Sequence, residues 1–197
     1  MLTLIVPVYN EAANLAALHT RVAAVMQQAD MTYELLFVND GSTDNSLKIM
    51  RELVAQDSRV RVVNLSRNFG QQAAYSAGLK HARGEAVVLL DADLQDPPEV
   101  IPRFVEQWEA GYDVVYGVRK RRKEGFGKRL SYTLFYRLLS RFSDIPIPRD
   151  TGDFCLMDRK VVDCITNDFP ENIRFVRGLR AYAGFRQTGV DYEREAR

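Results

Sequence analysis

The 197-residue sequence contains little cysteine or histidine, with two residues of each. Cys155 and Cys164 do not form a Cys-x-x-Cys pair, which argues against a disulfide framework and indicates a reducing compartment. We expect both to be small buried residues. His19 and His81 fall in helix-like segments without a ligand partner three or four residues away, so we interpret both as structural.

Long apolar runs are also absent. No stretch approaches the roughly 20 residues needed to span a bilayer, and the first residues lack the basic and apolar regions of a signal peptide. The formal net charge of +1 points to no particular class of partner, and we expect no nucleic-acid partner. The sequence as given therefore reads as soluble or peripheral to a membrane.

What is present is a regular alternation of strand-like and helix-like segments. Strands are predicted over residues 2–8, 33–38, 60–65, 86–90 and 114–117, and helices over 12–28, 46–55, 71–82 and 98–110. This order predicts an α/β fold with a mainly parallel sheet flanked by helices on both faces. In such sheets ligands bind at the carboxyl ends of the strands.

Polar residues follow the first four predicted strands. They occupy residues 7–11, 39–42, 66–70 and 91–96. Because the carboxyl ends of parallel strands meet at one edge of a sheet, these four loops are expected to build a common site.

Asp91 and Asp93 come directly after the apolar segment 86–90. Two carboxylates in this position suit a hard divalent cation, which keeps diphosphate oxygens as co-ligands and neutralises a departing diphosphate. Asp96 precedes two prolines, and we interpret it as the cap of the following helix. In the preceding loops, Asp40 could accept hydrogen bonds from a base or ribose, and Tyr9 could stack on a base.

Together, residues 6–11, 38–44, 66–70 and 91–99 resemble glycosyltransferase family 2. The closest likeness is to the branch of dolichyl-phosphate mannose synthases and bacterial polyprenyl-phosphate glycosyltransferases, and it covers nearly the whole chain. The resemblance implies a GT-A fold and an inverting transfer from a nucleotide-sugar with Mg²⁺ or Mn²⁺.

The same resemblance assigns roles to individual residues. It implies that Pro7, Tyr9, Glu11 and Asp40 hold the nucleotide, and that Asp91, Asp93 and Gln95 lie at the metal and diphosphate. It places Asp153 near the reacting centre, with Asp93 as the second residue expected to act in catalysis. Arg174 is expected to close over the diphosphate. Arg174, Arg177 and Arg180 follow each other at spacings of three, and their alternative role is as solvated charges.

A basic cluster occupies residues 119–123 and 128–129. Such a cluster binds phosphates or anionic membrane, the alternative being a solvated loop. Arg119, Arg122 and Lys128 are the candidates for an acceptor phosphate. Residues 120–143 predict a basic amphipathic, membrane-proximal segment, or else a surface helix packed on the domain.

These features predict a hexosyltransferase that uses a UDP- or GDP-sugar and a polyprenyl phosphate at the cytoplasmic side of the inner (plasma) membrane. A phosphate acceptor, with a second pKa near ~6, is already ionised and needs cations more than a base. Two alternatives stay open: transfer to a saccharide hydroxyl with Asp153 as base, and a catalytically silent nucleotide-binding module that recruits partners to membranes. A nucleotidyltransferase is a weaker rival because the first loop lacks glycine.

We expect residues 1–197 to form one catalytic domain, and a homo-oligomer is compatible with the sequence. The final residues read as an unfinished segment, so we expect a C-terminal transmembrane region that this sequence does not include.

Overall fold

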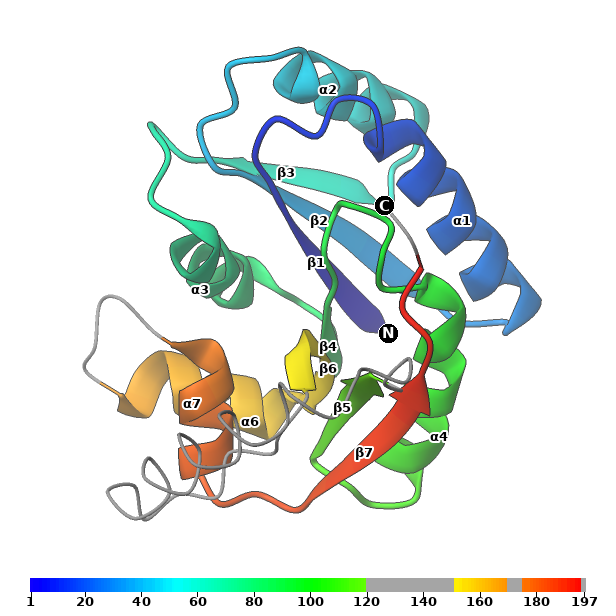
Figure 1. The fold of residues 1–197 in the computed structure, drawn as a ribbon, viewed down its shortest axis with the longest axis vertical. Helices are drawn as coiled ribbons and strands as arrows, with labels where there is room; N and C mark the ends of the chain where they lie inside the picture. The colour runs from blue at the N-terminus through cyan, green and yellow to red at the C-terminus, as the bar shows by residue number, and fades with distance from the viewer. Residues whose placement is uncertain (120–150, 170–174, 196–197) are drawn as a thin grey trace, which may run out of the picture.

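The computed structural model describes residues 1–119, 151–169 and 175–195, and over these ranges the chain builds one seven-stranded sheet (Figure 1). The strands are β1 (Leu2–Val8), β2 (Tyr33–Asn39), β3 (Val60–Asn64), β4 (Ala86–Leu89), β5 (Val114–Arg119), β6 (Thr151–Asp158) and β7 (Gln187–Tyr192). Their order is β3-β2-β1-β4-β6-β5-β7, and the pairings of β6 with β4 and β5 are the antiparallel ones. The predicted mainly parallel α/β sheet is therefore confirmed.

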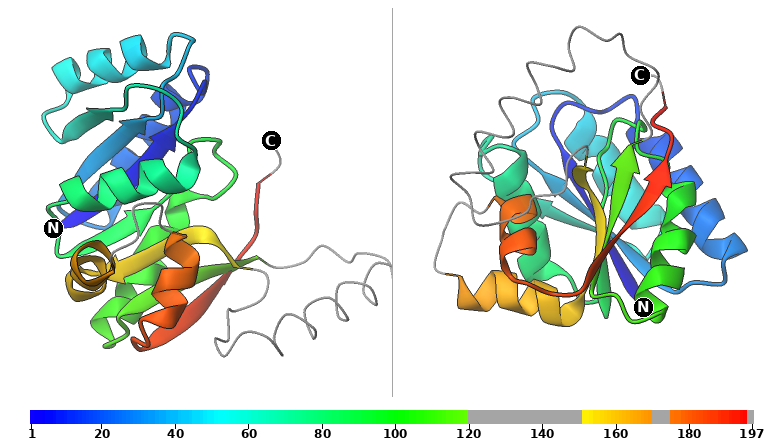
Figure 2. Two further views of the ribbon diagram at one scale, coloured as in Figure 1. Left: turned by 90° about the vertical axis from the view of Figure 1, so that its left-hand side faces the viewer. Right: turned by 60° about the horizontal axis from the view of Figure 1, so that its bottom comes forward.

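Helices cover both faces of the sheet (Figure 2). On one face lie α1 (Leu15–Gln28), α2 (Ser46–Gln56), the short 3₁₀ turn η1 (Pro98–Val100) and α4 (Ile101–Glu109). On the other lie α3 (Gln71–His81), α6 (Arg159–Asp163), its π-helical continuation η2 (Cys164–Asp168) and α7 (Val176–Tyr182). Within the described residues, no helix is long and apolar enough to cross a bilayer.

The central strands are apolar on both faces because each face carries its own helical layer. Leu4 of β1 packs toward the α1 side, whereas its neighbour Ile5 packs toward α3, and both are fully buried. Leu35 and Leu36 of β2 divide in the same way. Near-continuous apolar runs of this kind are typical of parallel strands buried on both sides.

The position of β1 determines where a ligand would bind. It pairs in parallel with β2 on one side and with β4 on the other. The chain thus builds outward from β1 to β3 and then returns across β1 to begin the second half of the sheet. This reversal leaves a crevice at the carboxyl ends of β1 and β4, the usual ligand position in an open α/β sheet.

Several sequence expectations need correction. Helix α1 begins at Leu15 rather than at residue 12, because residues 12–14 form a turn in which the N–H of Asn14 donates to the carbonyl of Glu11 at 2.9 Å. Strands β6 and β7 were not predicted from the sequence. Cys155 is buried as expected, but Cys164 is only half-buried. Trp108 packs beside the core and donates a hydrogen bond to Asp158 Oδ2 at 2.7 Å.

Leu36 offers a test of the core. Leu36→Ala is expected to lower the free energy of unfolding by about 2–5 kcal/mol, because the side chain is fully buried between β2 and its helical cover. Urea unfolding monitored by circular dichroism would measure the change. Val54→Ala on the exposed side of α2 is the control, with an expected change within about 0.5 kcal/mol. Equal losses in the two variants would contradict the placement of Leu36 in the core.

Candidate functional site

A hollow of about 380 Å³ lies at the carboxyl ends of β1, β2 and β4. Its lining comes from all four loops that the sequence predicts to converge: Pro7, Val8, Tyr9, Glu11, Asp40, Asn68, Gly70, Gln71, Asp91, Ala92 and Asp93. The structure therefore brings six of the predicted site residues into one place.

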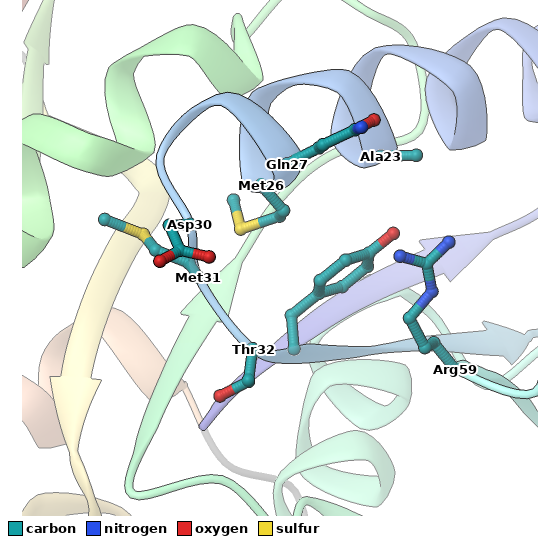
Figure 3. A pocket seen from close by; sticks show the side chains of 8 residues that line it. Ala23, Met26, Gln27, Asp30, Met31, Thr32 and Arg59 are labelled. Atoms are coloured by element: carbon teal, nitrogen blue, oxygen red, sulfur yellow. The ribbon is translucent and has the colours of Figure 1, made fainter.

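A second hollow of about 420 Å³ lies at the opposite edge of the sheet, between the end of α1 and the start of β2 (Figure 3). Asp30 is the one carboxylate in its lining, beside Arg59 and apolar residues of α1. Because parallel sheets bind ligands at the carboxyl ends of their strands, the hollow at Asp91 and Asp93 is the better candidate despite its similar size.

Asp40 shapes one wall of the site. Its side chain is buried, and its two oxygens accept hydrogen bonds from the backbone N–H groups of Phe69 at 2.8 Å and Gly70 at 2.9 Å. The next residue, Gly41, has φ 69°, and a Cβ there would lie 2.4 Å from the carbonyl carbon of Arg67. Asp40 and Gly41 thus fasten the loop after β3 against the end of β2.

The loop after β1 is held from the other side by the loop after β2. The backbone N–H of Glu11 donates to Ser46 Oγ at 3.0 Å, and that of Ala12 donates to Asp44 Oδ2 at 3.2 Å. Asp44 Oδ1 also accepts from the backbone N–H of Ser46, the first residue of α2, at 2.9 Å. Tyr9, at the mouth of the hollow, keeps 48% of its surface exposed and is open to a stacking partner.

Asp91 is held by two residues of α3 that the sequence reasoning missed. Its Oδ1 accepts from Gln71 Nε2 at 2.6 Å and from the Tyr75 hydroxyl at 2.7 Å. Burial raises the pKa of Asp91. The nearby carboxylates, Asp153 among them, raise it further, whereas the hydrogen bond from Tyr75 lowers it. Gln71 and Tyr75 lie four residues apart, so their shared helical face next to the predicted site was the available signal.

Asp93 is less enclosed than Asp91. Its Oδ1 accepts from the backbone N–H of Gln95 at 3.1 Å, and its Oδ2 lies 3.7 Å from the guanidinium of Arg194. Gln95 does not line the hollow, and its backbone carbonyl accepts from the N–H of Glu195 at 2.9 Å. Arg194 is a further residue that the sequence did not indicate, since it lies about a hundred positions from Asp93.

Asp153 enters from the antiparallel strand β6. Its Oδ2 accepts from Gln72 Nε2 at 3.1 Å, and Gln72 Oε1 accepts from the backbone N–H of Val176 at 3.0 Å. Gln72 therefore joins the predicted reacting-centre carboxylate to the start of α7. This bridge could not be read from the sequence, because it joins three elements that are far apart along the chain.

The expectation that Asp96 caps a helix is wrong. The side chain is 1% exposed, and the turn after it has no side-chain cap. Asp96 Oδ1 instead accepts from the Tyr192 hydroxyl at 2.5 Å and lies 3.4 Å from Arg194, while its Oδ2 lies 3.8 Å from Arg119. The reason is that β5 and β7 both end beside this loop, so that β7 and the residue after it bring the Tyr192 hydroxyl and Arg194 to Asp96, and β5 brings Arg119.

The structure describes only some of the residues predicted to bind the acceptor. Arg119, at the end of β5, donates to the Tyr192 hydroxyl at 3.2 Å. Arg122, Lys128 and Arg174 lie outside the described residues, as does nearly all of the predicted basic segment. Arg180 is 2% exposed and lies over the Tyr116 ring at 5.5 Å, so the description of it as a solvated charge is wrong.

The described residues give a partial rather than a complete metal site. They contain no group of three or more His, Cys, Asp or Glu side chains arranged to hold a metal ion. Asp91 and Asp93 nevertheless supply carboxylate oxygens to one hollow, and a cation, Arg194, already lies against Asp93. This donor set fits a hard divalent ion that draws further ligands from a bound phosphate.

Asp91→Asn is expected to raise the stability of the metal-free protein at neutral pH. The raised pKa of Asp91 means that its ionisation disfavours folding above that pKa, whereas below the ordinary aspartate pKa the group is protonated in both states. Asparagine keeps an oxygen for Gln71 and Tyr75. Thermal unfolding across pH 3–8 would therefore show a gain at pH 7 that disappears toward pH 3; a loss at pH 7 would contradict this electrostatic account.

This chain is similar over nearly its whole length to several proteins named as glycosyltransferases. A Bacillus subtilis protein named "Uncharacterized glycosyltransferase YkcC" is 52% identical over 196 residues, which is 99% of this chain and 60% of that protein. A Synechocystis protein named "Uncharacterized glycosyltransferase sll0501" is 46% identical over 100% of this chain and 62% of its own length. The bactoprenol glucosyl transferase of Shigella phage SfV is 38% identical over 100% of this chain and 64% of its own length. The chain thus spans about three fifths of these relatives.

Solved structures support the fold. A Pyrobaculum calidifontis mannosyltransferase, solved with GDP-Man and Mn²⁺, superposes with a TM-score of 0.66 at 22% identity, over 96% of this chain and 54% of its own. Glucosyl-3-phosphoglycerate synthase from Mycobacterium tuberculosis, solved with UDP, also superposes with a TM-score of 0.66. Its sequence is 19% identical, and the match covers 100% of this chain and 72% of its own. The fold is therefore the expected GT-A fold. Residues 3–166 match the family described as "Glycosyl transferase family 2", and the chain belongs to that family.

Proposed function

We propose that this chain catalyses inverting transfer of a hexose from a UDP- or GDP-sugar to a polyprenyl phosphate. The observation that carries the proposal is the single hollow at the switch point of the sheet, where Asp91 and Asp93 meet the loops bearing Tyr9 and Asp40. A nucleotide with a diphosphate needs this combination of a stacking surface, hydrogen-bond acceptors and neutralised phosphate oxygens.

On the donor side, Pro7, Tyr9, Glu11 and Asp40 form the nucleotide wall. Tyr9 stacks on the base through its exposed ring. Both oxygens of Asp40 accept hydrogen bonds from the loop after β3. Asp40 therefore contacts the nucleotide through the remaining lone pairs of these oxygens, and it also fixes the position of that loop beside the nucleotide. Arg174 closes over the diphosphate, the role that the family resemblance implies for it.

Asp91 and Asp93 hold a divalent cation, with Gln95 adjoining them. When bound, Mg²⁺ or Mn²⁺ neutralises the charge that develops on the departing diphosphate. Gln71 and Tyr75 fix the orientation of Asp91 by donating to its Oδ1, which leaves its second oxygen directed to the site. The mannosyltransferase solved with GDP-Man and Mn²⁺ supports this assignment by its similar fold.

On the acceptor side, the relatives named bactoprenol glucosyl transferase support a polyprenyl phosphate. Arg119, Arg122 and Lys128 position the phosphate, whose ionised oxygen attacks the anomeric carbon without a base. Asp153, held by Gln72, orients the acceptor group. We further propose that residues 1–197 form one catalytic domain and that residues 120–143 lie against the cytoplasmic face of the plasma membrane.

Calorimetric titration of UDP and GDP, with and without Mn²⁺, tests the donor site. We expect one nucleotide to bind in a metal-dependent manner, and Asp93→Asn to abolish the metal dependence, because it removes a carboxylate ligand. Asp30→Asn is the matched control, since Asp30 lines the hollow at the opposite edge. Failure of both nucleotides to bind the protein under every condition would refute the donor assignment.

The same substitution predicts a kinetic effect. Asp93→Asn is expected to lower kcat for transfer to polyprenyl phosphate by about 100-fold or more, because the leaving diphosphate loses its neutralising partner. Radiolabelled sugar incorporated into lipid measures the rate, with Asp30→Asn again as control. A variant with unchanged kcat would exclude Asp93 from the reaction.

The pH dependence separates the two acceptor chemistries. With a phosphate acceptor, the rate should rise through about pH 6 as the second phosphate proton is lost, and the rise should persist in Asp153→Asn. If Asp153 instead acted as a base on a saccharide hydroxyl, the activity would be lost in that variant. Transfer to soluble saccharides and not to polyprenyl phosphate would favour the second mechanism.

A further inference from the structure

The residues after β7 bring a cation onto the carboxylates of the site. Arg194 Nη2 lies 3.7 Å from Asp93 Oδ2, and its Nε lies 3.4 Å from Asp96 Oδ1. Asp93 lines the hollow, whereas Asp96 is buried behind it. One guanidinium therefore joins a partly buried carboxylate that lines the hollow to a fully buried one.

The chain fastens this segment on both sides of Arg194. Before it, the Tyr192 hydroxyl donates to Asp96 Oδ1 at 2.5 Å. After it, the N–H of Glu195 donates to the carbonyl of Gln95 at 2.9 Å.

The Glu195 carboxylate is held in turn by α1. It lies 2.7 Å from Arg21 Nη2, and the same arginine lies 2.7 Å from Glu99. Figure 1 shows this end of the described chain, in red, rising from β7 beside α4 toward α1. The position of Arg194 thus follows from fixed contacts along the segment.

The charges at this point determine what the contact does. Asp91, Asp93 and Asp96 are neighbours, since the charges of Asp93 and Asp96 both act on Asp91. Without a counter-charge, such a group of carboxylates is destabilised by mutual repulsion. A divalent cation on Asp93 would in turn repel the guanidinium, so the two cations compete for Asp93 Oδ2.

We propose that Arg194 is a tethered stand-in for the divalent cation. Its guanidinium neutralises the charge of Asp93 while the metal is absent and moves away from Asp93 when the metal binds. The ion pair with Asp96 then keeps the guanidinium at the edge of the site. This inference rests on the proposed function, because it takes Asp93 as a metal ligand. It makes Arg194 a positioning residue that sets how tightly the empty enzyme binds its metal.

Mn²⁺ binding without nucleotide tests the proposal independently of activity. The electron paramagnetic resonance signal of free Mn²⁺ gives the dissociation constant for the protein and for Arg194→Gln. We expect Arg194→Gln to bind Mn²⁺ about tenfold more tightly, because one competing positive charge is removed from Asp93. We also expect Mn²⁺ to raise the melting temperature of the variant more than that of the unchanged protein.

Arg103→Gln is the matched control. Arg103 donates to the backbone carbonyl of Asp191 at 2.9 Å, so its loss removes one charge beside the same strand without touching Asp93. Its Mn²⁺ affinity should be unchanged. Arg21→Gln loosens the segment while keeping Arg194, and a smaller tightening is expected; it also provides a test should Arg194→Gln fail to fold.

The outcomes separate the stand-in from the proposed function. Equal or weaker Mn²⁺ binding by Arg194→Gln, with metal-dependent nucleotide binding intact, overturns the stand-in alone. Equal tightening in Arg103→Gln also overturns it, because the effect would then be one of general charge. Mn²⁺ binding that Asp93→Asn leaves unchanged, or that is absent from every variant, overturns both the stand-in and the metal site.

Discussion

The crowding of carboxylates at one end of the sheet is the constraint on which the site depends. Asp91, Asp93 and Asp96 come from the loop after β4 and Asp153 comes from β6, and the other three carboxylates all raise the pKa of Asp91. The structure offsets this repulsion with the donors and cations already described: two side chains of α3 on Asp91, an amide on Asp153, and a guanidinium shared by Asp93 and Asp96. This concentration of negative charge is the feature on which the proposed cation site rests.

The convergence itself follows from the central position of β1. Because β2 and β4 pair with it in parallel on opposite sides, their following loops face one crevice. Asp40 then uses its carboxylate to fix the loop after β3, which makes it part of the scaffold as well as of the wall. The antiparallel strand β6 adds Asp153 from the other direction.

Much of this could be predicted from residues close together in the sequence. Apolar strands followed by polar loops predict the first half of the sheet, and Asp91 and Asp93 can be found because they directly follow such a strand. In the second half, β4 and β5 are predicted in this way, but β6 and β7 are not. Strand β6 has only a short apolar run after Asp153, and β7 mixes polar residues with few buried ones, so neither shows a clear period.

The sequence by itself determined the α/β class, the four loops of the site, the carboxylate pair and the family. Each of these depends on local order: an apolar run, a turn and the residue after it. Only the tertiary structure decided the partners of those carboxylates. Asp96 reads as a cap from its neighbours in sequence, but β5 and β7 end beside it and make it a buried anchor for Arg119 of β5 and for Tyr192 and Arg194 of the last segment. Contacts between residues a hundred positions apart arise from strand order, which local sequence does not encode.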